Sequence, residues 1–368
     1  MRLLIPPLIL PSFALSFVLT LLLKRLAPRF DFVDKPGQRK IHHTPKPLGG
    51  GIAVFLAIVL PVLAALTLVH FHTPASTSDP QSLAVYWAGI RHQTPLALKL
   101  ILAMAAVHVL GLADDRRAMG PMSKLIAQLA IITTLVVGAD IRALTFLDHY
   151  TLGRLPSIVL TVLWITAITN AFNFLDNMDG LSAGIAAVAS TAFLVAALLI
   201  GQWFVAALLA MLLGALLGFL CFNFSPASIF LGDSGSTLIG LLLGVLTIRT
   251  TYLLPGKSLG AGWYSVFVPV IVLAIPLYDL VVVSIIRIRN GKSPFVGDTN
   301  HLSHRLVRRG MSRRMAVLCI YLMTAATSSA AIVLPHVDSA FAAFALFAQT
   351  FLILGVVAVL EQHPLPQV

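Results

Sequence analysis

The sequence predicts an all-α polytopic membrane protein with about eleven transmembrane helices. The chain has 368 residues, of which 58% are hydrophobic and 11% are charged, and its mean hydropathy is +0.94. A soluble domain of this length could not bury so much apolar surface. Apolar windows recur along the whole chain and leave no soluble segment long enough to fold alone. One integral-membrane domain over residues 1–368 is therefore expected.

Eleven windows have the length of about 20 residues that crosses a bilayer. The first window is expected to stay as a span, because it is too long for a secretory signal and basic residues follow it where a cleavage site would have small ones. The windows lie at residues 3–24, 49–71, 96–113, 123–139, 156–173, 181–200, 203–222, 236–254, 263–286, 315–335 and 340–360.

Positive charge predicts the orientation of these spans. The connections 24–47, 114–124 and 287–314 hold 18 of the 25 Lys and Arg residues, and such residues stay on the cytoplasmic side. With eleven spans, the N-terminus is expected outside and the C-terminus in the cytoplasm. The net charge of +11 indicates topology first, and attraction to anionic lipid or an anionic substrate second. A nucleic-acid partner is not expected.

Carboxylates gather at the predicted cytoplasmic ends of the spans. Asp114 and Asp115 end the third span, Asp176 and Asp179 follow the fifth, and Asp233 precedes the eighth. An Asp at the centre of a membrane helix costs roughly 2.5–3.5 kcal/mol and less near the interface, so five on one face need a compensating charge. Mg²⁺ would supply that charge, because it prefers oxygen ligands. The alternative is that single carboxylates only cap helix N-termini.

Three other segments of the same face suit phosphate or nucleotide binding. The glycines at 49–51 would let a backbone approach a phosphate, although close helix packing explains them equally well. Phe230 could stack on a planar base or anchor the chain at the membrane interface. His301, His304 and Arg305 lie in an arginine-rich segment that suits a diphosphate, or in a solvated positive loop.

Five motifs in order then resemble a known family. "TPKPLGGG", "GLADDRR", "NAFNFLDNMDGLSAG", "IFLGDSGS" and "HLSHRL" resemble motifs of the polyprenyl-phosphate N-acetylhexosamine-1-phosphate transferases, in glycosyltransferase family 4, which are related to the phospho-MurNAc-pentapeptide translocase. The resemblance covers nearly the whole chain. It implies an enzyme of the bacterial inner membrane, with its site facing the cytoplasm. The implied reaction transfers an N-acetylhexosamine 1-phosphate from a UDP-sugar to undecaprenyl phosphate, releases UMP and starts cell-envelope polysaccharide synthesis.

The resemblance also implies roles for single residues. Asp233 would be the principal Mg²⁺ ligand, with Asp176 as a second ligand or close neighbour, and Mn²⁺ could replace Mg²⁺. Asp114 and Asp115 would lie near the acceptor phosphate, where one of them could act as a base if a base is needed. The remaining candidates are Asn173, Asp179, Asn223 and Phe230 for the uridine, His301, His304 and Arg305 for the diphosphate or sugar, and, more weakly, Lys40 and His43.

The implied active-site loops lie at about 25–48, 114–123, 174–180, 223–236 and 287–314. The last loop departs from the family pattern, because its H-x-H-H form reads "HLSH" here, with Ser303 where a His often stands. Its context favours UDP-GlcNAc as the donor, while UDP-GalNAc and UDP-MurNAc-pentapeptide stay open. Membrane lipid is an expected partner, and a homodimer is left open.

Two other classes of function compete with the transferase. Intramembrane acids also mark ion-coupled transporters, in which they lie near the bilayer midplane. Only Asp279 lies inside an apolar run here, and beside Pro276 it is more simply a packed, hydrogen-bonded structural residue. A scaffold that only binds undecaprenyl phosphate would need neither a carboxylate cluster nor a nucleotide site. The transferase is therefore the favoured interpretation.

Overall fold

A computed structural model describes residues 5–35, 44–72, 86–149, 153–250, 263–295, 297–337 and 339–362. Within these ranges the protein is almost entirely helical, as predicted. The α-helices are α1 (Ile9–Leu26), α2 (Gly50–Phe71), α3 (Trp87–Arg116), α4 (Pro121–Gly138), α5 (Leu155–Leu175), α6 (Leu181–Leu199), α7 (Trp203–Asn223), α8 (Asp233–Arg249), α10 (Val268–Val272), α11 (Ala274–Arg289), α12 (Leu302–Arg308), α13 (Arg313–Val333) and α14 (Ala340–Gln362). The shorter elements are the 3-10 helices η1 (Pro6–Leu8), η2 (Ala27–Phe30), η4 (Thr145–His149), η5 (Trp263–Phe267) and η6 (Leu334–His336), and the antiparallel strands β1 (Val33–Asp34) and β2 (Lys46–Pro47).

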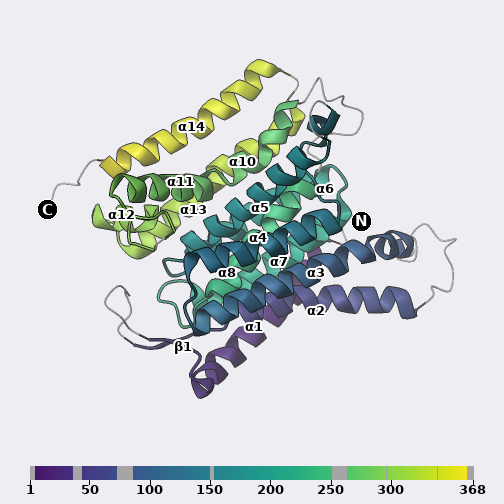
Figure 1. Cartoon of the computed structure of the whole chain (residues 1–368), viewed down its shortest axis with the longest axis horizontal. Coiled ribbons are helices and arrows are strands. Elements are labelled where there is room, and N and C mark those ends of the chain that lie inside the picture. The colour runs from purple at the N-terminus through teal and green to yellow at the C-terminus, as the bar shows by residue number, and fades with distance from the viewer. Residues whose placement is uncertain are drawn as a thin grey trace.

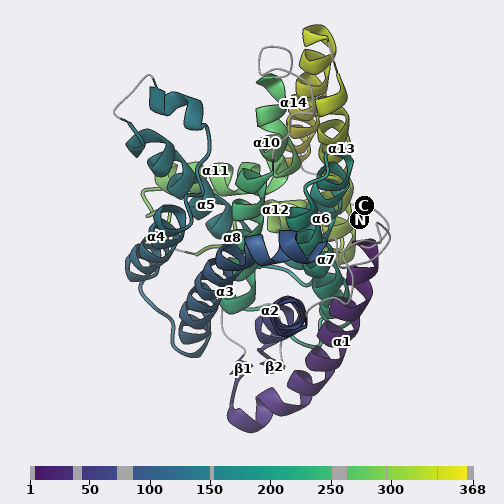
Figure 2. The same ribbon diagram turned by 90° about the vertical axis from the view of Figure 1, so that its right-hand side faces the viewer.

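The long helices lie side by side in one bundle (Figure 1). Seen along the bundle, α8 lies near the centre, and α1, α4 and α14 lie at the edge (Figure 2). Burial follows this arrangement, because all residues of α8 from Ser234 to Thr247 are buried, whereas most of α1 and α14 is not. Lipid is as apolar as the side chains of the outer helices, so those helices need no burial inside the protein.

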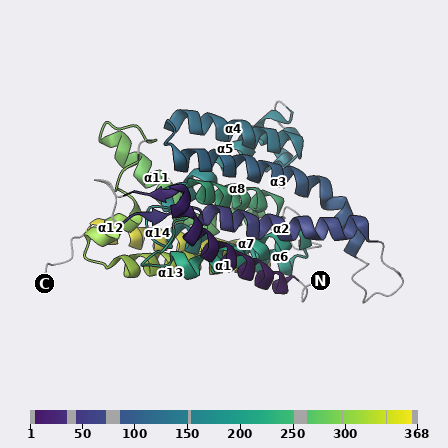
Figure 3. The same cartoon turned by 90° about the horizontal axis from the view of Figure 1, so that it is seen from below.

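Nine helices of the described ranges are long and apolar enough to cross a membrane, and α10 with α11 adds a tenth if this bent pair is one span. All eleven predicted windows overlap helices. The count differs because α8 has only 17 residues, about 25 Å at 1.5 Å per residue, and lies inside the bundle. The described chain begins and ends at opposite ends of the bundle (Figure 3).

Small residues let the helices approach closely. Gly214 and Gly218 of α7 face α1, and a Cβ on either would collide with the α1 backbone. Gly240 and Gly244 of α8 repeat this spacing against α5, where a Cβ on Gly240 would lie 2.5 Å from the Cα of Thr169. Membrane helices associate through such van der Waals contact. The central position of α8 therefore depends on its glycines.

The helices α10 and α11 meet at a bend of 68°. The bend lies at Leu273, which separates them, and each helix has a proline near its N-terminus, Pro269 and Pro276. The N–H groups of a first helical turn have no partner within the helix, so a proline there loses no hydrogen bond and is tolerated. The chain then leaves α11 toward α12, which lies at the same end of the bundle as β1 (Figures 1 and 3).

Candidate functional site

Several helix ends bring the predicted carboxylates to one place. Asp114 and Asp115 lie in the last turn of α3, Asp233 is the first residue of α8, and Asp176 directly follows α5. Lys124, in the first turn of α4, approaches them from a fourth helix. The predicted convergence of these aspartates at helix ends is therefore a feature of the structure.

The ammonium group of Lys124 lies between two of the carboxylates. Its Nζ is 2.9 Å from Oδ2 of Asp114 and also forms an ion pair with Oδ2 of Asp233. Only 12% of the lysine side chain is exposed, so the charges compensate one another away from bulk water. Sequence reasoning missed Lys124 as a site residue. The available signal was a lysine inside the apolar window 123–139.

The amide of Asn173 completes this cluster. Its Nδ2 donates to Oδ1 of Asp233 and to Oγ of Ser236, both at 3.0 Å. Its Oδ1 lies 3.5 Å from Nζ of Lys124. The NH₂ group of Asn173 thus contacts α8 and its amide oxygen lies near α4, so this one side chain of α5 connects the three helices.

Asp115 caps α8 from a different helix. Its carboxylate accepts hydrogen bonds from the backbone N–H groups of Asp233, at 2.7 Å, and Ser234, at 3.2 Å. These donors would otherwise lack a partner, because Gly232 precedes the helix and has no side chain to cap it. Gly232 has φ +75°, and a Cβ there would lie 2.6 Å from Oδ2 of Asp115. The close approach therefore requires glycine.

Asp176 lies deep in the cluster, although part of its surface stays accessible. Burial, reinforced by the negative charges of Asp233 and Asp115, raises the pKa of Asp176 well above its usual range. A hydrogen bond from the backbone of Gly232 opposes this shift. Burial is the larger cause of the shift, and a cation bound beside Asp233 and Asp115 would offset the part that comes from their negative charge.

Asp179 and Asn223 hold the connections around the cluster. Oδ2 of Asp179 accepts a hydrogen bond from the N–H of Ala227 at 2.9 Å. Asn223 is buried, accepts from the N–H of Gly180 at 3.0 Å and donates to the carbonyl of Ile229 at 2.9 Å. Both side chains thereby join the α5–α6 connection to the α7–α8 connection.

The backbone at Phe230 pairs with the segment before α2. The N–H of Phe230 donates to the carbonyl of Pro47 at 2.9 Å, and the N–H of Gly50 returns a bond to the carbonyl of Phe230 at 3.0 Å. A Cβ on Gly50 would collide with the ring of Phe219, and one on Gly51 would lie 2.5 Å from the nitrogen of Gly235. Of the two interpretations of this glycine run, close packing is the one that the contacts support at Gly50 and Gly51.

A second cluster is built around His301, directly before α12. Nδ1 of His301 lies 2.8 Å from Oδ2 of Asp279 in α11, and its Nε2 lies 3.3 Å from Nη2 of Arg287. Arg287 is 1% exposed and also donates to Asp298 at 3.0 Å. Burial alone would raise the pKa of Asp298, but hydrogen bonds from Arg287 and Asn300 hold it below its usual range. The prediction of a packed, hydrogen-bonded Asp279 is confirmed.

Arg305 lies on the far side of this cluster and contacts the last helix. Its Nη2 is 2.8 Å from Oε1 of Glu361 in α14 and 3.9 Å from Oδ1 of Asp279, and its Nη1 donates to the carbonyl of Asn300. Glu361 also accepts from the hydroxyl of Tyr278 at 3.2 Å. Glu361 was not among the predicted site residues.

Phe174 and Asn177 join the two clusters. The guanidinium of Arg287 lies over the Phe174 ring, 4.8 Å from its centroid, and the His301 ring meets the same ring edge-on at 5.6 Å. Ser303 contacts Asn177 through its hydroxyl. The basic segment 297–309 therefore packs directly against the α5–α6 connection that carries Asp176 and Asp179.

His304 lies beside this segment and is partly buried. Burial, with the positive charge of Arg308 nearby, lowers the pKa of His304. Its imidazole is therefore neutral at pH 7 and can accept a proton or a hydrogen bond. Lys40 and His43, the weaker candidates of the first loop, lie outside the described residues.

No three His, Cys, Asp or Glu side chains within the described ranges are arranged as a ready metal site. The oxygen donors nevertheless suit a hard cation, because Asp176, Asp233 and Asn173 offer carboxylate and amide oxygens close together. The donor set therefore fits Mg²⁺, in competition with the ammonium group of Lys124.

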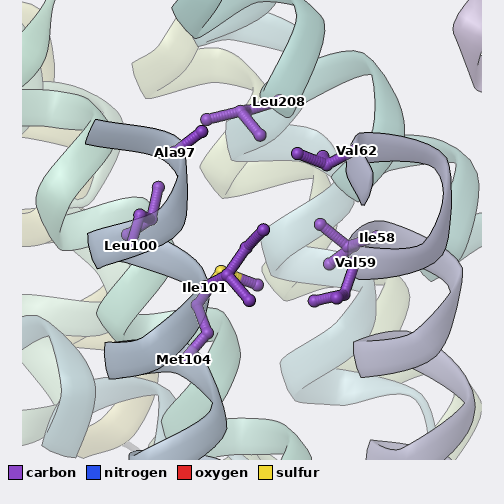
Figure 4. A pocket seen from close by; sticks show the side chains of 8 residues that line it. All are labelled: Ile58, Val59, Val62, Ala97, Leu100, Ile101, Met104 and Leu208. Atoms are coloured by element: carbon purple, nitrogen blue, oxygen red, sulfur yellow. The ribbon is translucent and has the colours of Figure 1, made fainter. Parts of the chain in front are cut away.

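A cavity of about 10 Å³ lies elsewhere, among the apolar side chains of α2, α3 and α7 (Figure 4). It is lined by Ile58, Val59, Val62, Ala97, Leu100, Ile101, Met104 and Leu208. The volume is about the least that one water molecule needs, and a water there would find no polar side chain. This cavity is therefore a packing defect and not a substrate site.

The fold and the site together define a polytopic membrane protein of a particular class. Its carboxylate–lysine cluster adjoins a basic segment at one end of the bundle. Carboxylates that can hold a metal ion and basic side chains that can bind phosphates are typical of enzymes that transfer phosphoryl groups. The chain belongs to glycosyl transferase family 4. The model of that family, described as "Glycosyl transferase family 4", matches residues 97–251, and the predicted family is confirmed.

Relatives from several bacteria match most of the chain. It is 33% identical, over 86% of its length, to a probable undecaprenyl-phosphate N-acetylglucosaminyl 1-phosphate transferase of Bacillus subtilis, of which it covers 81%. It is 34% identical, over 81% of its length, to a decaprenyl-phosphate N-acetylglucosaminephosphotransferase of Mycobacterium tuberculosis, of which it covers 74%. It is 28% identical, over 83% of its length, to an undecaprenyl-phosphate alpha-N-acetylglucosaminyl 1-phosphate transferase of Escherichia coli, of which it covers 77%.

Proposed function

We infer that this protein transfers N-acetylglucosamine 1-phosphate from UDP-GlcNAc to a polyprenyl phosphate such as undecaprenyl phosphate. The observation that carries the inference is the cluster of Lys124, Asp114, Asp233 and Asn173, which lies where α3, α4, α5 and α8 meet at one end of the bundle. The acceptor is a lipid whose phosphate lies at the membrane surface, and the donor is a soluble nucleotide. A site at the ends of spanning helices is within reach of both.

The reaction exchanges one phosphorus–oxygen bond for another. A phosphate oxygen of the polyprenyl acceptor attacks the phosphorus that carries the sugar, the bond from that phosphorus to the UMP oxygen breaks, and UMP leaves with the bonding electrons. Such a transfer is accelerated mainly by positioning and by neutralising negative charge. Lys124 and the basic segment 297–309 provide positive charge on two sides of the α5–α6 connection.

Asp114 and Asp115 have different parts in this proposal. Asp115 is bound by two backbone N–H groups at the start of α8, so its role is to hold that helix end and Asp233 in place. Asp114 is bound by the side chain of Lys124 and by the N–H of Met119. A lysine side chain can move toward a substrate phosphate, and its departure would free Asp114 to accept a proton from the acceptor.

Mg²⁺ is proposed as the cofactor, with Mn²⁺ as a substitute. Asp233 and Asp176 would hold it, and the carbonyl oxygen of Asn173 lies beside them. When bound, the ion neutralises charge that develops on the phosphate oxygens. Lys124 from α4 and His304 from the basic segment are proposed to face the phosphates. His301 and Arg305, which are bound to Asp279, Arg287 and Glu361, are proposed to hold that segment against the diphosphate and sugar.

The uridine is proposed to bind near Phe230, with its base against that ring and its polar groups toward Asn173 and Asp179. Asn223 supports this region by holding two connections together. Lys40 and His43 remain proposed contacts from the first loop. The site is proposed to face the cytoplasm of the bacterial inner membrane, where nucleotide sugars are made.

Purified protein, undecaprenyl phosphate and Mg²⁺ are incubated with UDP-GlcNAc, UDP-GalNAc or UDP-MurNAc-pentapeptide, and UMP release is measured. We expect release with UDP-GlcNAc, its loss in EDTA and its return with Mg²⁺ or Mn²⁺. Asp233→Asn should lower kcat at least about a hundredfold. Asp140→Asn is the matched control, because Asp140 is exposed, lies in the α4–α5 connection outside the site, and pairs with Arg142. Absence of UMP release with every donor would refute the proposed function.

A further inference from the structure

Asp279 is a buried carboxylate for which the proposed reaction has no use. It lies in α11 with no exposed surface and makes two short contacts to the start of α12. Its Oδ2 is 2.8 Å from Nδ1 of His301, and its Oδ1 accepts the N–H of Leu302 at 2.6 Å. A buried charge costs several kcal/mol unless it is paired, so these contacts explain how it is tolerated.

The partners of His301 define which ring nitrogen carries hydrogen. Arg287 can only donate hydrogen bonds, so Nε2 of His301, 3.3 Å from Nη2 of Arg287, must be the acceptor. Nδ1 then carries the hydrogen and donates it to Asp279. The carboxylate accepts only, so the line from Asp279 through His301 to Arg287 is consistent at each contact.

The same carboxylate also caps α12. The residue before α12 is His301, whose side chain makes no capping bond, and Asp279 supplies the missing acceptor from α11. Asp115 does the same for α8. In both places a helix that carries site residues begins at a carboxylate from another helix, which fixes the position of its first turn.

We propose that Asp279 is a positioning residue that sets the tautomer and orientation of His301, and through it the Arg287 guanidinium against Phe174. The proposal rests on the proposed function in one respect, that the basic segment binds the diphosphate and sugar of the donor. Its effect should therefore fall on that part of the donor and spare the uridine. A residue needed only for folding would not discriminate between these parts.

Binding measurements on the whole protein in detergent test this without turnover. Asp279→Asn keeps nearly the same volume but leaves one acceptor oxygen for two donors, Nδ1–H of His301 and the N–H of Leu302, and turns an NH₂ group toward the other donor, so the paired arrangement at the start of α12 is broken. We expect the Kd for UDP-GlcNAc to rise on the order of tenfold or more, as for loss of a hydrogen bond to a charged group. The Kd for UMP should stay within about twofold. Equal weakening of both ligands would overturn the proposal.

A double-mutant cycle tests whether Asp279 acts through His301. In a His301→Ala background, Asp279→Asn should raise the Kd for UDP-GlcNAc by less than about twofold further. Independent, multiplicative losses would overturn the proposal. Ser284→Ala is the control, because Ser284 lies on the same helix and its hydroxyl donates to the carbonyl of Leu280, away from His301.

A rescue variant covers the case in which Asp279→Asn does not fold. The amide of His301→Asn can donate to Asp279 and accept from Arg287, so it should bind UDP-GlcNAc more tightly than His301→Ala. No difference between the two variants would overturn the proposal. If the wild type binds UDP-GlcNAc but releases no UMP, the proposed function fails while these binding results still decide the role of Asp279.

Discussion

The hydroxyl of Ser303 donates a hydrogen bond to Oδ1 of Asn177, with 2.5 Å between the two oxygens. Ser303 is 1% exposed, and Nδ2 of Asn177 donates in turn to the carbonyl of Phe174 at 2.6 Å. The residue that departs from the family pattern therefore connects the basic segment to the loop that carries Asp176 and Asp179.

Ser303→Ala is expected to lower kcat/KM by roughly two- to twelvefold, the equivalent of about 0.5–1.5 kcal/mol for one hydrogen bond. Ser303→Thr keeps the hydroxyl and should lose less. UMP release measured for Ser303→Ala, Asn177→Ala and the double variant gives the coupling between the two residues. A purely additive double variant would show that the hydrogen bond has no part in activity.

Lys124→Met is expected to abolish nearly all activity. It removes the positive charge that pairs with Asp114 and Asp233 and that is proposed to neutralise the substrate phosphates. We expect kcat/KM to fall at least about a hundredfold, with partial activity in Lys124→Arg. Lys99→Met serves as the control, because Lys99 bonds to the carbonyl of Gly138 and lies outside the cluster. Near-normal turnover in Lys124→Met would remove the lysine from the reaction.

The lowered pKa of His304 predicts a pH dependence of stability. The unfolded chain binds a proton at His304 near the ordinary pKa of about 6.5, while the folded protein binds it only at lower pH. Unfolding therefore becomes easier as the pH falls through and below this value. Between pH 8 and pH 5 the thermal midpoint of the wild type should fall more steeply with decreasing pH than that of His304→Gln. Parallel curves for both proteins would contradict the assignment.

Glu361→Gln is expected to weaken the contact between α14 and the basic segment. The amide keeps an acceptor for one partner but loses the charge that faces Arg305. We expect a lower thermal midpoint and a lower kcat/KM. A chain that stops after Gln362 keeps Glu361 and should behave like the wild type, whereas one that stops after Val359 should not. Full activity in the chain that stops after Val359 would show that the ion pair between Glu361 and Arg305 is dispensable.

The predicted orientation is tested by labelling single cysteines after Cys221 and Cys319 are replaced. Ser293 and Thr145 are both exposed and lie on the predicted cytoplasmic and outer sides. A membrane-impermeant thiol reagent added to intact cells should label Thr145→Cys and not Ser293→Cys, which reacts only after permeabilisation. The reverse pattern would invert the topology.

The sequence predicted the helical class and the gathering of aspartates, because both follow from features that the chain displays locally. Apolar windows have a fixed length set by the bilayer, and short carboxylates at the ends of those windows are conspicuous. Arg287 escaped prediction as a site residue because it is one of eight basic residues in its connection. Lys124 was counted with the basic residues of the connection 114–124, although it also lies inside the apolar window 123–139. Only the packing of α4 and α11 shows which positive charge turns inward.

Asp115 and Glu361 show a second limit. Nothing local distinguishes Asp115 from Asp114, yet one binds backbone N–H groups of α8 and the other binds a lysine side chain. Glu361 lies more than fifty residues along the chain from Arg305. Such pairings depend on how distant helices pack, and neither periodicity nor motif spacing contains that information.

The contact between Glu361 and Arg305 has a consequence for biosynthesis. A ribosome makes the chain from its N-terminus, so the aspartates and Lys124 are present long before the last helix exists. A product cut short before α14 would carry the acidic half of the site while Arg305 lacked its anchor. Arg305 therefore acquires its ion pair with Glu361 only after α14 has been made and has packed against the basic segment.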